Sequence, residues 1–190
     1  MSDAYEPNDD SLFLSKIVTE VHAERVVEVG VGSGFVIAEY VEVNAPELAV
    51  GTDLDVEAIK VAQKRRGHDS VDYICCRSCD AFRMDVFQLV FFNPPYLKDE
   101  KDYDAATSGG EKGVERTCEM AFSSYWAMAP RGRMLFLASS LSDIGYLLRR
   151  LQDEGMEPKR LATCKLFFEE LFAFEVRKDS FSRRSRSRRR

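Results

Sequence analysis

The tetrapeptide Asn93-Pro94-Pro95-Tyr96 follows a strongly apolar run and has residue types suited to holding an NH₂ group. Two consecutive prolines fix φ, remove two N–H donors and keep the preceding residues out of a helix. This corner presents two acceptors, the Asn93 side-chain oxygen and the Pro94 carbonyl, which can orient an amide or exocyclic amine toward an electrophilic methyl group. Tyr96 adds a flat face for stacking. We expect Asn93, Pro94 and Tyr96 to act in catalysis, and all four residues to bind substrate.

A second motif, Glu28-x-Gly30-x-Gly32-x-Gly34, lies where a strand is expected to turn into a helix. Glycines there permit positive φ and close approach of a ligand, and the first N–H groups of a helix attract an anion. The spacing differs from the GxGxxG of nicotinamide enzymes. The expected anion is therefore the carboxylate of a methionine-derived cofactor, and a Gly-rich structural turn is the alternative.

Acidic residues after the next two expected strands extend this cofactor site. Asp53 follows the glycines by about 20 residues, where a carboxylate can accept both ribose hydroxyls. Capping of the next helix is its alternative role, although Asp55 is better placed for that. Asp80 is expected beside the adenine, but aspartate also favours turns.

Strand and helix patterns alternate along most of the chain. The expected strands are residues 25–29, 48–52, 71–76, 87–92 and 134–139, and the expected helices are 35–43, 56–66, 114–128 and 142–154. Residues 160–167 and 171–177 are predicted to form a terminal antiparallel hairpin, and 98–113 a mobile loop. The Phe-rich segment 167–174 is expected in the core. This order predicts an α/β, Rossmann-like, seven-stranded sheet that is mostly parallel.

Composition predicts one domain, residues 1–180, followed by a basic Ser/Arg-rich tail, residues 181–190, that we expect to be disordered. The tail carries six arginines, which leaves 21 basic against 32 acidic residues elsewhere. An acidic body argues against binding duplex nucleic acid, so the tail is the one segment suited to RNA.

The sequence contains no apolar run of the ~20 residues that span a bilayer, and its first ten residues lack a secretory pattern. We expect a cytoplasmic protein, with a nuclear pool also compatible, and no membrane partner. The five cysteines include Cys76-x-x-Cys79, but a zinc site requires two more ligands at matching spacing. We expect reduced thiols and no metal.

Taken together, the motifs resemble the class I methyltransferases of the HemK-like release-factor glutamine methyltransferase family. Tyr5-Glu6-Pro7-Asn8-Asp9-Asp10-Ser11 resembles the family's Tyr-Glu-Pro-Ala-Glu-Asp-Thr, and Thr52-Asp53-Leu54-Asp55 resembles its Thr-Asp-Ile-Asn/Asp. Residues 109–115 resemble its Gly-Gly…Gly…Glu element. The resemblance extends from residue 5 to about residue 177.

The resemblance implies S-adenosyl-L-methionine as methyl donor and S-adenosyl-L-homocysteine as product. By position it implies that Tyr5 and Pro7 cap the pocket and contact substrate. It implies a cofactor pocket lined by Ser11, Glu28, Gly30, Gly32, Gly34, Asp53, Leu54, Asp80, Ala81 and Asn93. The short stretch between Asp80 and Asn93 departs from the family pattern.

The first expected strand begins at Arg25, which leaves no room for the helical domain that precedes it in bacterial stand-alone members. The chain therefore resembles the short archaeal and eukaryotic catalytic subunits, which methylate the glutamine of the Gly-Gly-Gln loop in the class-1 translation release factor. In eukaryotes these work as a heterodimer with a small zinc-binding activator. Residues 73–76 form a predicted edge strand without charge or proline, where a partner strand could add. A local loop covering that edge is the alternative.

Three other functions compete with this hypothesis. An adenine-N6 methyltransferase acting on DNA or RNA could use the same corner, but it usually needs a basic groove and extracts the base from its stack. A lysine methyltransferase must first remove a proton from its amine. A cofactor-binding scaffold subunit would have no activity, although the complete motifs argue against it.

Overall fold

The structure is a computed structural model that describes residues 8–64, 70–96 and 112–179. Tyr5, Pro7, most of the expected 98–113 loop and the Ser/Arg tail lie outside the described residues. The elements are α1 Asp9–Val18, β1 Arg25–Val29, α2 Phe35–Asn44, β2 Leu48–Asp53, α3 Val56–Ala62, β3 Asp72–Cys75, β4 Phe87–Phe92, α4 Glu115–Ala127, β5 Met128–Ser139, α5 Ile144–Asp153, β6 Lys159–Lys165 and β7 Glu170–Arg177. Every helix in these ranges is too short or too polar to cross a bilayer.

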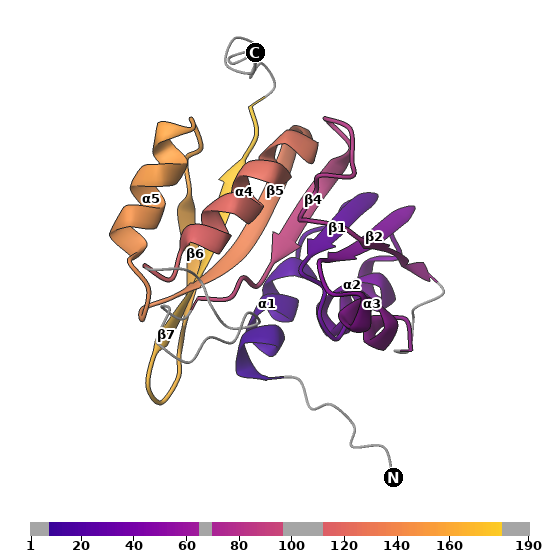
Figure 1. Cartoon of the computed structure of the whole chain (residues 1–190), viewed down its shortest axis with the longest axis horizontal. Coiled ribbons are helices and arrows are strands. Elements are labelled where there is room, and N and C mark those ends of the chain that lie inside the picture. Colours follow the sequence, from indigo (N-terminus) through magenta and orange to yellow (C-terminus); the bar gives the residue numbers. More distant parts are fainter. Residues whose placement is uncertain (1–7, 65–69, 97–111, 180–190) are drawn as a thin grey trace.

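The strands form one seven-stranded sheet in the order β3-β2-β1-β4-β5-β7-β6 (Figure 1). Strands β1 to β5 pair in parallel, whereas β7 is antiparallel to both β5 and β6. The predicted mostly parallel sheet with a terminal antiparallel hairpin is confirmed. Because the parallel strands share one direction, the residues that follow β1, β2, β3 and β4 meet at one edge of the sheet, where open α/β sheets bind ligands.

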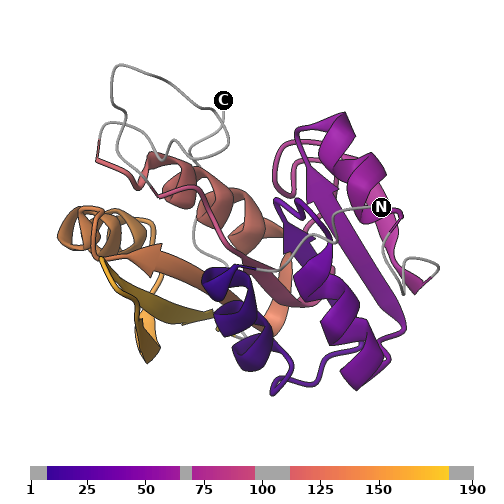
Figure 2. The ribbon, with the colours of Figure 1, turned by 90° about the horizontal axis from the view of Figure 1, so that it is seen from below.

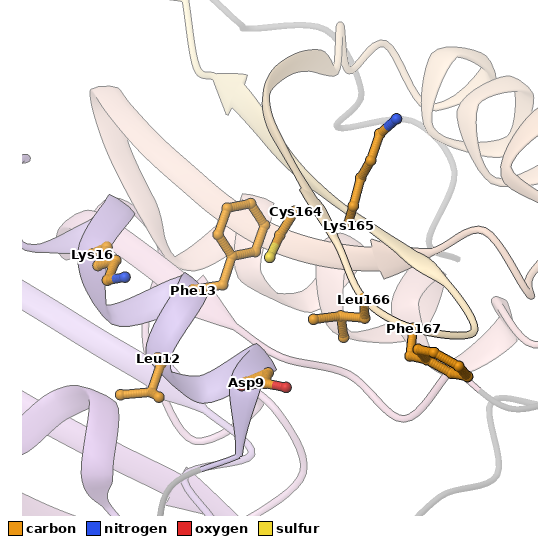
Figure 3. Close-up of a pocket in the computed structure, with 8 residues that line it drawn as sticks. All are labelled: Asp9, Leu12, Phe13, Lys16, Cys164, Lys165, Leu166 and Phe167. Atoms are coloured by element: carbon orange, nitrogen blue, oxygen red, sulfur yellow. The ribbon is translucent and has the colours of Figure 1, made fainter.

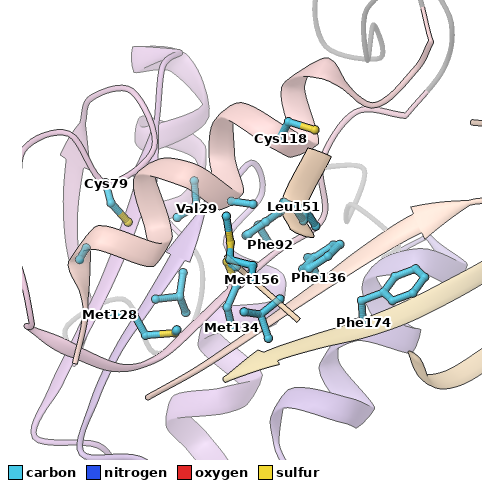
Figure 4. Close-up of a cluster of buried hydrophobic side chains, with 14 of the residues drawn as sticks. Val29, Cys79, Phe92, Cys118, Met128, Met134, Phe136, Leu151, Met156 and Phe174 are labelled. Atoms are coloured by element: carbon cyan, nitrogen blue, oxygen red, sulfur yellow. The ribbon is translucent and has the colours of Figure 1, made fainter. Parts of the chain in front are cut away.

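Two hydrophobic cores cover the two faces of the sheet, and successive residues of β4 alternate between them. Val90 and Phe92 face α4 and α5, while Leu89 and Phe91 face α1, α2 and α3. Phe92, Phe136 and Phe174 form a row of stacked rings across three neighbouring strands, with centroids 5.3 and 5.6 Å apart (Figure 4). This alternation fixes the register of β4, since a shift by one residue would exchange its two faces.

The structure differs from the expected elements in four main places. The helix expected over residues 56–66 ends at Ala62. No element was expected before residue 25, yet Asp9–Val18 is a helix with two acidic residues in its first turn and Lys16 in its last. Strand β5 begins at Met128, six residues before the expected start, because a register shift opposite Phe87 absorbs the break at Pro130-Arg131-Gly132. The expected core segment 167–174 is wrong at its start, where Phe167 and Phe168 are exposed at the tip of the β6–β7 hairpin.

Helix α1 is held against the domain by its packing on α2 and by one buried hydroxyl (Figure 2). Tyr40 of α2 donates its phenolic hydrogen to the carbonyl of Val21 and accepts from the backbone N–H of Ala23. Its side chain is fully buried, and burial raises its pKa. These bonds fix the segment that joins α1 to β1, and so determine where the first turn of α1 lies.

We predict that Tyr40→Phe lowers the free energy of unfolding by about 1–3 kcal/mol, because it leaves the buried Ala23 N–H without its acceptor. Urea denaturation measures this change. Tyr146→Phe is the control, since this half-buried ring contacts Lys112 through its face and should change stability by under about 0.5 kcal/mol. Equal stability of Tyr40→Phe and the wild type would contradict the assignment.

Candidate active site

The glycine motif forms the turn between β1 and α2, with φ of +70° at Gly30, +50° at Gly32 and +72° at Gly34. A β-carbon on Gly34 would lie 2.9 Å from Cβ of Ala62, so α3 packs directly on this loop. The Val31 N–H donates to the Thr52 carbonyl at the end of β2. The loop is therefore a tight, left-handed turn that leaves Gly30 exposed at the ligand-binding edge.

Glu28 is 4% exposed and lies beneath this loop rather than on its surface. One carboxylate oxygen accepts from the backbone N–H of Ile37, 2.9 Å away, in the first turn of α2. A negative charge at a helix N-terminus is stabilised by the helix dipole and by the unpaired N–H groups. Glu28 thus joins β1 to α2 and shapes the loop. Its contact with cofactor stays a prediction.

Asp53 lies at the end of β2 and already contacts the glycine loop. Its two carboxylate oxygens accept from the N–H of Gly32 and the N–H of Asp55, each at 3.0 Å. Asp55 caps α3 by accepting from Glu57 N–H at 2.8 Å, as expected. With the capping role taken by Asp55, the half-buried Asp53 is left facing the loop, in the position suited to ribose hydroxyls.

The remaining predicted cofactor residues lie along the same edge of the sheet. Leu54, next to Asp53, is 62% exposed. The N–H of Cys76, just after β3, donates to the carbonyl of Asp53, which places the following turn beside β2. Within that turn Asp80 and Ala81 are exposed, and Asp80 accepts a 2.8 Å bond from the Ser123 hydroxyl of α4. Their proposed contact with adenine stays a prediction.

The corner after β4 is fixed by contacts with two other parts of the chain. Pro94 is buried, and the backbone carbonyl of Tyr96 accepts from the Ser142 hydroxyl at 2.8 Å. The Asn93 amide nitrogen donates to a carboxylate oxygen of Asp10 at 2.8 Å. The Asn93 oxygen is enclosed and has no hydrogen-bond partner in the described structure. The amide is therefore oriented by its nitrogen, and its buried oxygen has an unused capacity to accept a hydrogen bond among the described residues.

Asp10 was not predicted as a site residue from the sequence, yet its carboxylate contacts Asn93 in the structure. It is 8% exposed and lies in the first turn of α1, 83 positions before Asn93. Its second carboxylate oxygen accepts from the N–H of Ser11. In the sequence, this aspartate stood out only as part of the motif of residues 5–11 that resembles the family's opening segment. Ser11 follows Asp10 in the chain and is half-buried. Its hydroxyl donates to the side-chain oxygen of Asn8.

The Tyr96 hydroxyl lies 3.4 Å from Asp10, so one carboxylate oxygen receives both Tyr96 and Asn93. Burial and the negative charges of Asp10 and Glu169 raise the pKa of Tyr96 well above its ordinary value. Tyr96 therefore remains a neutral phenol in the physiological range. It can donate a hydrogen bond and offer its ring, but it cannot act as a base there.

Burial also raises the pKa of Cys79 to about 12 and that of Cys118 to about 11. Both are protonated thiols at neutral pH, and the thiol form is a poor nucleophile and a poor metal ligand. Within the described ranges no three His, Cys, Asp or Glu side chains gather as they would around a metal ion.

These residues suit a cofactor that has a carboxylate, a ribose and an adenine. The glycine loop offers N–H groups at a helix start to the carboxylate, and Asp53 offers acceptors to the ribose hydroxyls. The acceptor corner at Asn93 lies at the same sheet edge, two strands away from Asp53. A cofactor held by the glycine loop and Asp53 would lie across the ends of β1 and β2, and the corner would face it from the end of β4. Fold and site together define a class I, S-adenosylmethionine-dependent methyltransferase.

Comparison with protein families agrees, since the methyltransferase small domain model matches residues 8–116. The chain therefore belongs to the methyltransferase small domain family. A candidate protein N5-glutamine methyltransferase from Methanocaldococcus jannaschii is 29% identical over 182 residues, covering 92% of this chain and 91% of that protein. The resemblance to the glutamine methyltransferases found in the motifs is confirmed.

Solved structures show the same fold. The complex of Mtq2 and Trm112 from E. cuniculi, described as methylating the translation termination factor eRF1, matches with a TM-score of 0.74 and 21% identity. The match covers 93% of this chain and 99% of that chain. The N-methyltransferase NodS from Bradyrhizobium japonicum, bound to S-adenosyl-L-homocysteine, matches with a TM-score of 0.63 and 14% identity over 89% of this chain and 84% of that one.

We predict that Asp53→Ala raises the dissociation constant for S-adenosylmethionine about 10- to 100-fold, because a charged acceptor for the ribose is lost. Isothermal titration calorimetry measures the constant. Asp55→Ala is the matched control two residues away, since it removes only the α3 cap. It should cost about 1 kcal/mol of stability and leave cofactor affinity unchanged. Equal affinities of Asp53→Ala and the wild type would remove Asp53 from the pocket.

Proposed function

We propose that this chain methylates the side-chain amide nitrogen of a glutamine in a protein, the glutamine of the Gly-Gly-Gln loop of a class-1 translation release factor. The observation that carries the proposal is the Asn93 amide. The Asn93 amide nitrogen donates to the Asp10 carboxylate at 2.8 Å, and the Asn93 amide oxygen is enclosed without a partner among the described residues. A buried acceptor left unpaired costs stability, so its retention favours a ligand that donates a hydrogen bond.

A glutamine side chain ends in an NH₂ group with two donors and a lone pair delocalised into its carbonyl. The Asn93 oxygen and the Pro94 carbonyl accept these two N–H bonds, which turns the nitrogen toward the cofactor. S-adenosylmethionine, when bound, supplies an electrophilic methyl group. The nitrogen becomes positively charged as it gains that methyl, and both acceptors stabilise the charge. It then loses a proton to solvent, so no strong base is required.

Asp10 has two roles in this proposal. It fixes which end of the Asn93 amide faces the substrate, since only the NH₂ end of Asn93 can donate to a carboxylate. Asp10, which is 8% exposed, also places a negative charge near the reacting nitrogen, with only the Asn93 side chain between them. Such a charge stabilises a developing positive charge more strongly in a partly buried site than in water.

The relatives support the glutamine substrate and a partner subunit. The M. jannaschii relative carries the name of a protein N5-glutamine methyltransferase, and the E. cuniculi structure is a complex of a methyltransferase with Trm112. We propose that this chain is likewise the catalytic subunit of a heterodimer with a small zinc-binding activator, and that it acts in the cytoplasm.

The β3 edge is the proposed contact for that activator. Strand β3 is the last strand on its side of the sheet and pairs with β2 alone among the described strands. Its outer backbone groups are suited to bonding an added strand. Cys75 is exposed there, while Tyr73 and Ile74 are half-buried.

The direct test is methylation of the purified release factor with labelled S-adenosylmethionine, with and without the activator. Mass spectrometry should place one added methyl on the glutamine of the Gly-Gly-Gln loop. Methylation of adenine in an oligonucleotide, with the release factor left unmodified, would overturn the proposal.

We predict that Asn93→Ala lowers kcat at least 1,000-fold while cofactor affinity stays within a few-fold, because the acceptor that orients the nitrogen is lost. Asn44→Ala is the control, since the Asn44 amide bonds Thr19 far from the site and its loss should leave kcat unchanged. Single-turnover methyl transfer measures the effect. Retention of near wild-type kcat in Asn93→Ala would exclude Asn93 from the mechanism.

We predict that Asp10→Ala lowers kcat about 10- to 100-fold, because Asn93 then loses its fixed orientation. Asp10→Asn separates the two roles of this residue. An amide oxygen at position 10 can still accept from Asn93, so this variant should recover part of kcat, and the remaining deficit reports the lost charge. An Asp10→Ala variant with unchanged kcat would show that the contact with Asn93 is not required.

A further inference from the structure

We propose that the exposed pair Phe167–Phe168 and the groove beside it dock the segment of the protein substrate that flanks the methylated glutamine. This inference rests on the proposed function and adds a recognition surface to it. The occupant is a polypeptide segment with one large apolar side chain followed by an acidic one.

The groove has a volume of about 440 Å³ and runs between helix α1 and the β6–β7 hairpin (Figure 3). Its lining from α1 comes from one helix face, spaced three and four residues apart as on a single helix surface. Its other wall is the end of β6 and the turn that follows. The lining residues are Asp9, Leu12, Phe13, Lys16, Cys164, Lys165, Leu166 and Phe167. Phe13 and Cys164 point toward each other across the groove.

Neither phenylalanine belongs to the two hydrophobic cores of the described residues. Phe167 is 91% exposed and Phe168 is 85% exposed, although phenylalanine is among the residues most often buried. Their rings contact each other edge to face, with centroids 4.6 Å apart. Apolar side chains displayed beside a groove are typical of a protein-binding surface, and buried aromatic rings contribute strongly to such contacts.

The hairpin tip is held next to the catalytic corner. Glu169, adjacent to Phe168, accepts from the Ser139 hydroxyl, and its charge acts on Tyr96. Backbone and side-chain bonds also join Glu170 to Ser140. On the opposite wall, Asp9 precedes Asp10, the residue that orients Asn93. The Asp9 end of the groove therefore lies beside the catalytic corner, and the hairpin that forms the other wall is tied to the end of β5 at the same edge of the sheet.

Charge gives the groove a direction. Lys16 lines it about two helical turns from Asp9 and is exposed, whereas the Lys165 side chain points away from the groove (Figure 3). An exposed ammonium group on the wall of the groove is suited to pairing with a carboxylate of the occupant. An acidic residue of the substrate is thus expected beyond the apolar one, farther from the methylated glutamine.

The test is steady-state methylation of the purified release factor by the double variant Phe167→Ala/Phe168→Ala, with the activator present. We expect KM for the release factor to rise about tenfold or more, with kcat and the dissociation constant for S-adenosylmethionine unchanged. Lys16→Glu should raise KM about threefold or more, and this effect should shrink at high salt. Val43→Ala is the matched control, since Val43 is 64% exposed on α2, outside the groove, and should leave KM unchanged.

The outcomes separate this inference from the proposed function. No methylation of the release factor by the wild type overturns the proposed function. Wild-type activity together with an unchanged KM in the double variant overturns the docking surface alone, and this includes the case in which another part of the chain covers the groove. Because both rings are exposed, the double variant should melt within about 2 °C of the wild type.

Discussion

The hydrogen bond between Asp10 and Asn93 is the constraint on which the active site depends. A primary amide has a donor end and an acceptor end, and it binds an incoming NH₂ group only when the acceptor end faces it. The carboxylate settles this choice because it can accept and cannot donate. The prolines that follow hold the backbone in place, and the Ser142 bond to Tyr96 closes the corner from the other side. In the proposed mechanism, substrate binding and catalysis therefore both depend on this one rigid arrangement.

The parallel sheet explains how distant motifs form one site. Glu28, Asp53 and Asn93 belong to three adjacent strands, and each lies at or just beyond the same edge. Two of these side chains also serve the scaffold, since Glu28 stabilises the start of α2 and Asp53 ties the end of β2 to the glycine loop. The cofactor loop is thus shaped before any ligand binds, which reduces the entropy lost on binding.

Much of the fold could be predicted because strands and helices alternate with clear periods and the glycine and proline motifs mark the strand ends. Helix α1 was missed, although Asp9, Asp10 and Lys16 complement its dipole and were a usable signal. The bond from Asp10 to Asn93 could not be predicted, because it depends on how a separate helix docks on the sheet. Phe167 and Phe168 were wrongly expected in the core because composition does not distinguish a buried strand from the tip of a hairpin.

Helix α1 is only ten residues long, and the side chain of its N-cap residue, Asn8, makes no capping bond to the backbone. Its first turn, which carries Asp10, is the part of a helix that unfolds most readily. The orientation of the Asn93 amide therefore depends on the local stability of a single helical turn and not on the stability of the whole sheet. Warming should break the bond between the carboxylate and the amide before the cores unfold. We therefore expect methyl transfer to be lost at a lower temperature than the temperature at which the domain unfolds.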